Sequence, residues 1–199
     1  MGSEMCIRDS GHDHAGVAIT LTYLGNAYMY LGDYAKQRDL QERALAIEER
    51  AYGRDHPNVA ITLTNLGNAY CELGDHAKSR DILERTLAIM ERAYGRDHAS
   101  VASTLNNLGN AYNELGEPSK ARDVLERALA IFERAYERDH ADVAMTLTRL
   151  GFTYGALGDN SKKRELLERA LPIWTRVYGT DDPHTILLRS ELELSLIHI

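Results

Sequence analysis

Four histidines, each preceded by an aspartate, recur at intervals of 42 residues: His14, His56, His98 and His140. Imidazole and carboxylate groups are common metal ligands, so such a set invites a zinc-site hypothesis. Histidine ligands, however, must approach one ion to within about 2 Å, and residues spaced one repeat apart are too distant to share it. We therefore interpret these histidines as linker residues and expect neither a metal nor a cofactor.

No residue is predicted to be catalytic. Cys71 is the only cysteine after residue 10, and no histidine or other base lies in register with it, although a cysteine nucleophile is normally activated by such a base. The sequence has no phosphate-binding glycine-rich loop and no spacing typical of a catalytic triad. We expect Trp174 to pack in the last helix pair. Solvated helix faces are expected for Glu84-Arg85, Glu126-Arg127 and Glu168-Arg169.

The sequence repeats itself every 42 residues. TNLGNAYCELGD, residues 64–75, returns as NNLGNAYNELGE, residues 106–117, and residues 55–96 match residues 97–138 at 29 of 42 positions. The copies are residues 13–54, 55–96, 97–138 and 139–180, with a partial copy or cap at 181–193, where Arg189 replaces a leucine. Self-similarity of this kind predicts a solenoid, in which each unit buries its apolar face against its neighbours.

Each copy carries the pattern of two helices and no alternating strand pattern, so we predict an all-α protein. Asp55 and His56 can cap the first helix of the second copy, Pro57 suits its first turn, and Gly74 can end it. Its predicted buried face comprises Ala60, Leu63, Leu66, Gly67, Tyr70 and Leu73.

The second helix of this copy begins after Asp75, which can cap it, and ends at Gly95. On its outer face, Asp81 and Arg85 are four residues apart and predict an ion pair of about 0.2–0.5 kcal/mol. The residues predicted to point inward are Ile82, Leu83, Leu87, Met90 and Tyr94.

A glycine recurs in the middle of every first helix, where it costs about 1 kcal/mol relative to alanine. The four are Gly25, Gly67, Gly109 and Gly151. We expect this cost to be offset by close approach of the second helix. The facing residues are predicted to be Ala44, Thr86, Ala128 and Ala170.

Composition narrows the class of partner. The net charge is −7, whereas a nucleic-acid-binding surface needs a basic stripe. No apolar run approaches the roughly 18 residues of a membrane span. We therefore expect a protein or peptide partner, without nucleic acid or membrane insertion. A single cysteine among the repeats favours a reducing compartment, so we expect a cytoplasmic location.

The two ends of the chain, MGSEMCIRDS and LSLIHI, fit no part of the repeat. If MCIRDS is encoded by ATG TGT ATA AGA GAC AG, the opposite strand encodes LSLIHI. This sequence looks like the end that transposase-based sequencing libraries attach to DNA fragments. We therefore interpret residues 1–10 and 194–199 as adapter-derived tails, and residues 11–193 as a piece of a larger multidomain chain. The alternative is that the two tails are native and complementary by chance.

The copies resemble the tetratricopeptide repeat. Residues 63–89, LTNLGNAYCELGDHAKSRDILERTLAI, carry its Leu-Gly, Tyr, Gly-Asp and second-helix Ala signature, with Leu63 at the usual large aromatic position. The standard repeat has about 34 residues. The 42-residue form, with its longer second helix, is similar to the repeats of kinesin light chain and its relatives. The resemblance covers residues 11–193 and implies a right-handed α-solenoid whose first helices line a concave, peptide-binding groove.

Carried onto this sequence, the resemblance assigns an inner wall. Its central register holds Asn26, Asn68, Asn110 and Phe152; the turn before holds Thr22, Thr64, Asn106 and Thr148, and the turn after holds Met29, Cys71, Asn113 and Gly155. A carboxamide both donates and accepts, so aligned asparagines could bind a peptide backbone whatever its side chains. The alternative is that they are solvated residues inherited by duplication.

Charge on this inner wall does not select an acidic ligand. Arg149 is the only cation assigned to it, and Glu72 and Glu114 oppose it. A neutral or partly basic peptide therefore fits as well as an acidic one.

Three functions are compatible with the sequence. The first is a non-catalytic protein-interaction scaffold with a peptide in its groove. The second is a regulatory or sensor segment of a larger signalling NTPase or other enzyme, and the third is an architectural spacer without a groove ligand. Replacing both Asn68 and Asn110 with alanine would weaken partner binding in the first two cases and not in the third.

Overall fold

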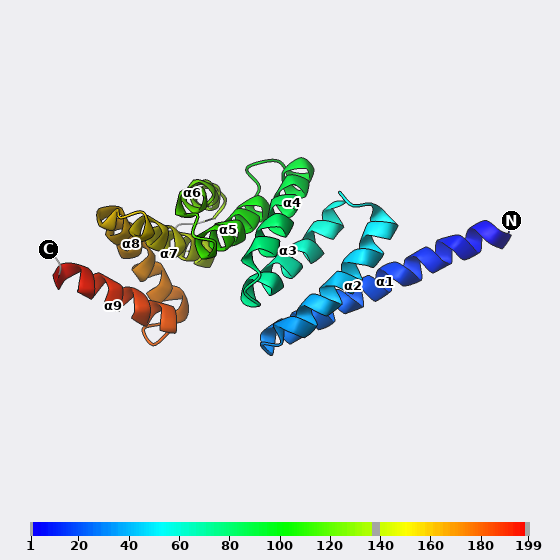
Figure 1. Ribbon diagram of the computed structural model, residues 1–199, viewed down its shortest axis with the longest axis horizontal. Coiled ribbons are helices and arrows are strands. Elements are labelled where there is room, and N and C mark those ends of the chain that lie inside the picture. The colour runs from blue at the N-terminus through cyan, green and yellow to red at the C-terminus, as the bar shows by residue number, and fades with distance from the viewer. Residues whose placement is uncertain (1, 137–139, 198–199) are drawn as a thin grey trace. The chain divides into compact units, whose positions relative to one another are not determined.

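The computed structural model describes residues 2–136 and 140–197, with side chains from Ala15 to Leu194 within these ranges. Over this part of the chain there are nine α-helices and no strand (Figure 1). The helices are α1 (Gly2–Tyr30), α2 (Tyr34–Tyr52), α3 (Pro57–Glu72), α4 (His76–Tyr94), α5 (Ala99–Glu114), α6 (Pro118–Ala135), α7 (Ala141–Ala156), α8 (Asn160–Tyr178) and α9 (Pro183–Ile197).

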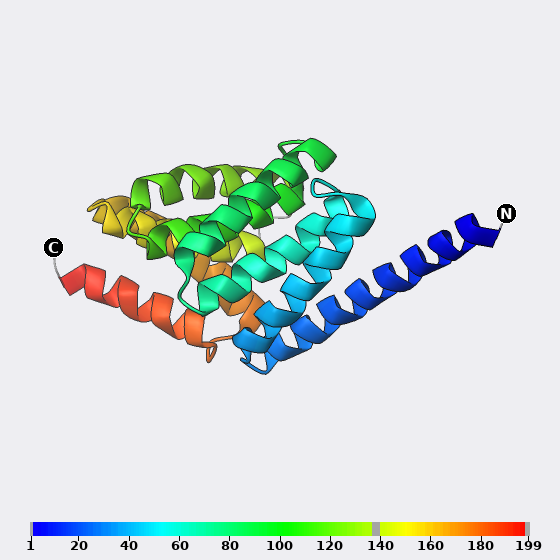
Figure 2. The same ribbon diagram turned by 45° about the vertical axis from the view of Figure 1, so that its right-hand side comes forward.

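The helices form two compact units. Unit 1, Met1–Gly95, holds α1–α4, and unit 2, Arg96–Ile199, holds α5–α9. Within each unit a helix packs mainly on the helices before and after it in sequence, as the two ribbon views show (Figures 1 and 2). The first helices of successive copies also touch, α1 on α3 and α5 on α7. Such nearest-neighbour packing is typical of repeat arrays, and the prediction of an all-α array of helix pairs is confirmed.

The histidines begin the first helices of the second, third and fourth copies. The Nδ1 atoms of His56, His98 and His140 each accept the backbone N–H two residues on, at 3.2 Å. Each contact satisfies one of the free donors at a helix N-terminus. The predicted linker role is thereby confirmed for these three. The side chain of His14 lies outside the described residues, and α1 continues through that position.

The predicted apolar faces of α3 and α4 are largely buried, but Tyr70, Ile82 and Leu87 are only half-buried. Leu73, the C-cap of α3, and Tyr94, the last residue of α4, are exposed instead of inward. Both lie where a helix ends, so less of the neighbouring helix covers them. Ile89, which the inward set omitted, is buried. The predicted residues found buried in α3 and α4 are Ala60, Leu63, Leu66, Gly67, Leu83 and Met90.

The mid-helix glycines bring the two helices of a copy together. A Cβ atom built on Gly67 would lie 2.9 Å from Cγ of Leu83, too close for any side chain without rearrangement. Close approach is confirmed, but the facing residue lies one turn before the predicted Thr86. The same correction applies in the other copies, where the facing residues are Gln41, Leu125 and Leu167 and not Ala44, Ala128 and Ala170.

The end segments also contain helix. Helix α1 begins at Gly2 and α9 extends to Ile197, so each predicted adapter tail lies partly in a helix. A helical backbone carries no information on how a segment was encoded, and the origin of the tails stays a prediction. Helix α9 packs on α8 through buried Thr185 and Leu188, while Arg189 is exposed.

Candidate functional site

In unit 1 the predicted inner-wall residues of α1 and α3 lie on neighbouring helices. These helices meet where the hydroxyl oxygens of Thr22 and Thr62 are 3.4 Å apart. We call the side of α1 and α3 that carries Asn26 and Asn68 the inner face of unit 1. Both asparagines are half-buried, as are Thr22 and Thr64. Unit 1 therefore brings four of the ten predicted site residues together.

The two asparagines of the inner face differ in how much of the carboxamide is free. Oδ1 of Asn26 accepts a hydrogen bond from Nε2 of Gln41 at 3.1 Å, so the N–H groups of Asn26 remain for a ligand. Asn68 makes no side-chain hydrogen bond to any residue that the structure describes. Thr64 donates to the carbonyl of Ala60 in its own helix at 2.8 Å. Asn68 is therefore the residue best able to both donate to and accept from a peptide.

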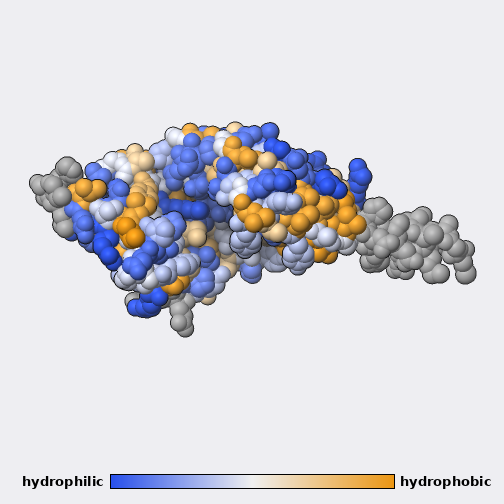
Figure 3. Space-filling model, turned by 90° about the horizontal axis from the view of Figure 1, so that it is seen from below, coloured by the Kyte–Doolittle hydropathy of each residue, from blue (hydrophilic) through white to orange (hydrophobic). Residues whose placement is uncertain are grey.

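The inner face of unit 1 also carries exposed apolar side chains that the sequence prediction omitted. Ile19 lies seven residues before Asn26 and Ile61 seven before Asn68, so each lies on the same helix side as its asparagine. Tyr30, four residues after Asn26, is 83% exposed. In Figure 3, hydrophobic residues gather beside the grey N-terminal atoms. These residues could have been predicted from the sequence, because their helical spacing from Asn26 and Asn68 places them on the same side of each helix.

In unit 2 the predicted residues lie on α5 and α7, and two of them are not accessible. Asn106 and Thr148 are buried, and the Thr148 hydroxyl accepts from Nε1 of Trp174 at 3.0 Å. The expectation that they line an open wall is therefore wrong for these two side chains. Asn110 is half-buried, and Nδ2 of Asn113 donates to Oγ1 of Thr153 at 2.9 Å, which ties α5 to α7.

The cations of unit 2 also differ from the prediction that Arg149 alone supplies positive charge to the inner wall. Arg149 donates to the backbone carbonyl of Asn106 at 3.0 Å and so helps join α5 and α7. A second cation, Lys163 of α8, lies with Nζ 5.4 Å from the ring centroid of Phe152 and 2.7 Å from Glu191 of α9. Gly155 makes room for it, since a Cβ there would lie 2.8 Å from Cδ of Lys163. Sequence reasoning missed Lys163 because it belongs to a second helix.

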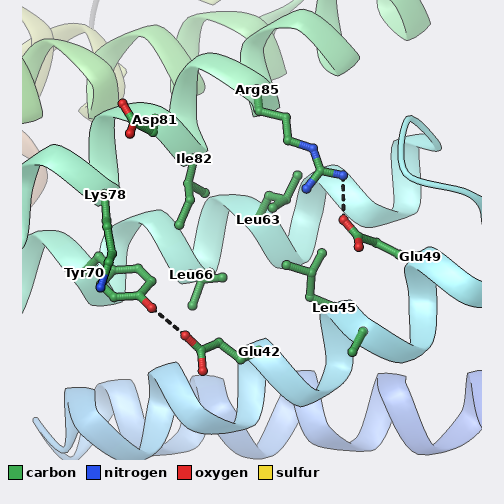
Figure 4. A pocket seen from close by; sticks show the side chains of 11 residues that line it. Glu42, Leu45, Glu49, Leu63, Leu66, Tyr70, Lys78, Asp81, Ile82 and Arg85 are labelled. Atoms are coloured by element: carbon green, nitrogen blue, oxygen red, sulfur yellow. Dashed lines mark hydrogen bonds and ion pairs between the residues drawn. The ribbon is translucent and has the colours of Figure 1, made fainter.

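A cleft of about 430 Å³ opens on another side of unit 1, between α2 and α4, with α3 as its floor (Figure 4). Apolar side chains line its base, among them Leu45, Leu66 and Ile82. Leu45 and Ile82 are half-buried, whereas their counterparts two copies later in unit 2, Leu129 and Leu166, are buried. The corresponding surface of unit 2 is therefore more closely filled.

Two contacts cross this cleft and recur in unit 2. The hydroxyl of Tyr70 on α3 donates to Glu42 on α2, and Arg85 on α4 binds Glu49 on α2 at 2.6 Å (Figure 4). We call this pair of contacts the inter-repeat clasp. The predicted Asp81–Arg85 pair is therefore wrong, because Arg85 reaches the preceding copy. In unit 2 the clasp comprises Tyr154–Glu126 and Arg169–Glu133, the latter at 2.5 Å.

The clasp changes the interpretation of the Glu-Arg pairs. Glu126 accepts from Tyr154 and Arg169 binds Glu133, so these residues join successive copies and are not merely solvated. The hydrogen bond to Glu126 and partial burial raise the pKa of Tyr154 to about 12, and Glu42 does the same for Tyr70. Each tyrosine hydroxyl therefore stays protonated, as a donor must, far into the alkaline range.

The first copy buries polar side chains at two registers, those of Gln41 and Glu48, where the other three copies have apolar ones. Gln37, Gln41 and Glu48 of α2 are buried, and one oxygen of each has no hydrogen-bond partner among the described residues. Nε2 of Gln37 donates to the carbonyl of Asn65 at 3.2 Å, and Nε2 of Gln41 to the carbonyl of Thr22 at 3.3 Å. Burial raises the pKa of Glu48, partly offset by a hydrogen bond with Thr62.

Cys71 has a histidine neighbour that sequence register did not reveal. Nδ1 of His76, at the start of α4, lies 3.8 Å from Sγ of Cys71, because the tight turn after α3 returns the chain. The statement that no base neighbours this cysteine is therefore corrected. Among the described residues no group of three or more His, Cys, Asp or Glu side chains could hold a metal ion, and no helix has the length and apolar character of a membrane span.

Comparisons with known proteins identify the repeat. Tetratricopeptide repeat models match residues 16–91, 61–134 and 143–184. No curated protein sequence matches significantly. Among solved structures, a candidate kinesin light chain of Podosopora anserina with nearly identical TPR-like repeats superposes with a TM-score of 0.77 at 23% identity, covering 92% of this chain and 87% of that one.

Two further structures show the same fold. BtubC (BKLC) from P. vanneervenii has a TM-score of 0.78 at 23% identity, covering 98% of this chain and 78% of that one. The apo form of RapI has a TM-score of 0.72 at 20% identity, covering 94% and 52%. At these identities the likeness concerns the fold, and the solenoid fold expected from the sequence is confirmed.

Proposed function

Because this chain belongs to the tetratricopeptide repeat family, we propose that it is a protein-interaction scaffold whose inner face in unit 1 binds an extended, uncharged peptide. The observation that carries the proposal is the chemistry of this face. Half-buried carboxamides at Asn26 and Asn68 lie among exposed Ile19, Tyr30 and Ile61.

The charge pattern supports an uncharged ligand. Residues 15–30 of α1 contain no Asp, Glu, Lys or Arg, and α3 contains only Glu72, its last residue. An acidic peptide side chain placed here, or a basic one placed away from Glu72, would lose hydration without gaining a counter-ion, which is unfavourable. Apolar side chains would instead gain about 25 cal/mol for each Å² of apolar surface they bury. The face therefore favours aliphatic or aromatic anchors on a peptide without net charge.

The carboxamides would fix the peptide backbone. Asn68 can donate to a peptide carbonyl and accept from a peptide N–H, while Asn26 can donate. Each such bond contributes about 0.5–1.5 kcal/mol, so the backbone contacts set register and the apolar anchors supply most of the affinity.

The experiment is selection from a phage-displayed library of random peptides, followed by affinity measurement by fluorescence anisotropy. Asn68→Ala should weaken the selected peptides about threefold to tenfold, the loss of one or two hydrogen bonds. Ile61→Glu should abolish binding, because it places a charge among the apolar anchors. Ile186→Glu, at a similarly exposed isoleucine of α9, is the matched control and should leave affinity unchanged. Peptides that bind Ile61→Glu as tightly as the parent protein would refute the proposal.

A further inference from the structure

The inner face of unit 1 carries a row of aromatic and aliphatic side chains along α1. Ile19, Tyr23, Asn26 and Tyr30 follow one another at intervals of four, three and four residues, so they lie in one line on the helix. Tyr23 and Tyr30 are 70% and 83% exposed, and Ile19 is 51% exposed. Two tyrosine rings therefore flank the carboxamide of Asn26 on the open side of α1.

This row stays open if a further copy of the repeat precedes α1. In α3, the residue that meets the preceding first helix is Thr62, whose hydroxyl oxygen lies 3.4 Å from that of Thr22 on α1. The counterpart of Thr62 in α1 is Thr20, so a first helix before α1 would lie against Thr20 and extend the wall. Ile61, the counterpart of Ile19, is 54% exposed although α1 packs beside α3. The inner face is therefore accessible inside an array as well as at its end.

Equivalent side chains on α1 and α3 are spaced like every third residue of a polyproline II helix. Ile19 and Ile61 occupy the same register on two helices that touch at Thr22 and Thr62, and the axes of touching helices are about 8–10 Å apart. Polyproline II rises about 3.1 Å per residue and turns once in about three residues, so every third residue lies on the same side about 9 Å further on. Same-side residues of a β-strand lie about 6.6 Å or 13 Å apart and do not match this spacing.

The carboxamides of the inner face fit a backbone with unpaired carbonyls. Oδ1 of Asn26 already accepts from Gln41, so Asn26 offers only N–H donors to a ligand. Polyproline II has no internal hydrogen bonds and proline has no N–H, so a proline-rich segment presents many acceptors and few donors. An α-helical ligand also repeats its surface after about 10–11 Å, but its backbone groups are paired and would cover Asn26 and Asn68 without satisfying them.

The exposed tyrosines supply flat surfaces for proline rings. Aromatic-lined grooves bind proline-rich segments because such segments are already extended before they bind and lose little conformational entropy. Tyr23 and Tyr30 present aromatic rings on either side of Asn26. Residues 15–30 of α1 carry no charge and α3 carries only Glu72, at its end, which suits a segment without charged side chains.

We propose that the inner face of unit 1 binds a proline-rich segment of a partner protein in the polyproline II conformation, with an aliphatic residue at every third position. The proposal rests on the proposed peptide-binding function and adds to it the conformation and spacing of the ligand. Successive aliphatic residues contact Ile19 and Ile61, the carboxamides of Asn26 and Asn68 donate to carbonyls one turn apart, and proline rings pack on Tyr23. The segment runs across α1 and α3, because equivalent positions follow one another across the helices.

The test titrates fluorescein-labelled synthetic peptides into the full chain and follows fluorescence anisotropy. The first peptide has three Leu-Pro-Pro units, the second has the same composition with its three leucines adjacent, and the third has threonine in place of every proline. The parent protein should bind the first peptide at least about tenfold more tightly than the second, which loses the spacing, and the third, which keeps the spacing but favours a strand.

Two tyrosine variants test the aromatic contacts. The double variant Tyr23→Ala, Tyr30→Ala should bind the first peptide at least about fivefold more weakly than the parent, since two ring contacts are lost. Tyr178→Ala, at a 50% exposed tyrosine of α8, is the matched control and should leave affinity unchanged. Tyr23 and Tyr30 are exposed, so the double variant should keep the fold, which circular dichroism checks.

Equal binding of the three peptides would overturn the proposal, as would equal binding of the first peptide by the parent and the double tyrosine variant. Library-selected peptides that are lost in Ile61→Glu, together with no preference for the Leu-Pro-Pro peptide, would overturn the proposal and leave the peptide-binding function standing. A parent protein that binds neither selected peptides nor the Leu-Pro-Pro peptide would refute both.

Discussion

Replacing Gln41 with leucine should stabilise the first helix pair. Gln41 is fully buried and occupies the register in which the other three copies have leucine against a mid-helix glycine. Its Oε1 has no partner among the described residues, and its Nε2 makes contacts of 3.1 Å and 3.3 Å to Asn26 and Thr22. The substitution therefore removes an unpaired buried oxygen and adds apolar burial, at the loss of two hydrogen bonds.

The expected change in the free energy of unfolding is the sum of three contributions. Burying a leucine side chain contributes about 1.5–3 kcal/mol. Removing an unsatisfied buried group gains about 1–3 kcal/mol, and each lost hydrogen bond costs about 0.5–1.5 kcal/mol. The net gain is about 2 kcal/mol in the free energy of unfolding. For a chain of this length, it corresponds to a rise of about 4–8 °C in melting temperature if unfolding is cooperative.

Urea titration should be combined with hydrogen exchange, because repeat arrays open from their ends and the gain should appear as slower exchange in α1 and α2. Leu125→Gln is the reciprocal control, at a fully buried leucine of the third copy, and should destabilise the chain by more than about 2 kcal/mol. A Gln41→Leu protein that is less stable than the parent, or unchanged in α1 and α2 exchange, would refute the reasoning.

Three further results are expected. The pKa values of Tyr70 and Tyr154 are raised to about 12, so these two tyrosines should ionise last, and the stability they add is present below pH 10 and lost between pH 10 and 12. In absorbance titrations, the Tyr70→Phe and Tyr154→Phe variants should each lose signal from the late part of the curve. A loss of signal from the early part instead would contradict this. The pKa of Glu48 is raised, so the stability that its protonated form contributes is fully present below the ordinary glutamate pKa and lost as pH rises through the folded value. Urea titrations should therefore show the parent losing stability relative to Glu48→Gln as pH rises from 4 to 8. The same dependence of unfolding free energy on pH in both proteins would count against a buried carboxyl. Gly109→Ala should lower the free energy of unfolding by about 1–2 kcal/mol, since the new Cβ would lie 2.5 Å from Cγ of Leu125. Gly16→Ala, where nothing lies within 4 Å of the new Cβ, should raise it by up to about 1 kcal/mol. Similar changes from both substitutions would contradict the close-approach explanation.

The fold could be predicted from the sequence because its signals are local and repeated. Gly74 and Asp75 mark a turn through their own conformational and capping preferences, and the same turn recurs in each copy. The spacing of Leu63 and Leu66 fixes a buried face without knowledge of the partner helix. Errors arose at helix ends, as with Tyr94, because burial there depends on how far the neighbouring helix extends.

The candidate sites were only partly predictable, since they depend on contacts between copies. Arg85 has an acidic residue four positions away in its own helix, and nothing local shows that it binds Glu49 of the preceding copy instead. Thr148 has the register of an open wall residue, yet Trp174 covers it from another helix. Ile61 was not among the predicted site residues because those residues were chosen for polar groups, although helical spacing from Asn68 places it on the same side.

Methyl NMR of the isoleucines, with a selected peptide at saturation, tests the central claim most directly. Ile19 and Ile61, on the inner face of unit 1, should show the largest shift changes, while buried Ile89 and Ile173 should change little. This pattern would place the peptide against α1 and α3, on the proposed inner face. Changes concentrated at Ile82, in the cleft between α2 and α4, with Ile19 and Ile61 unaffected, would contradict it.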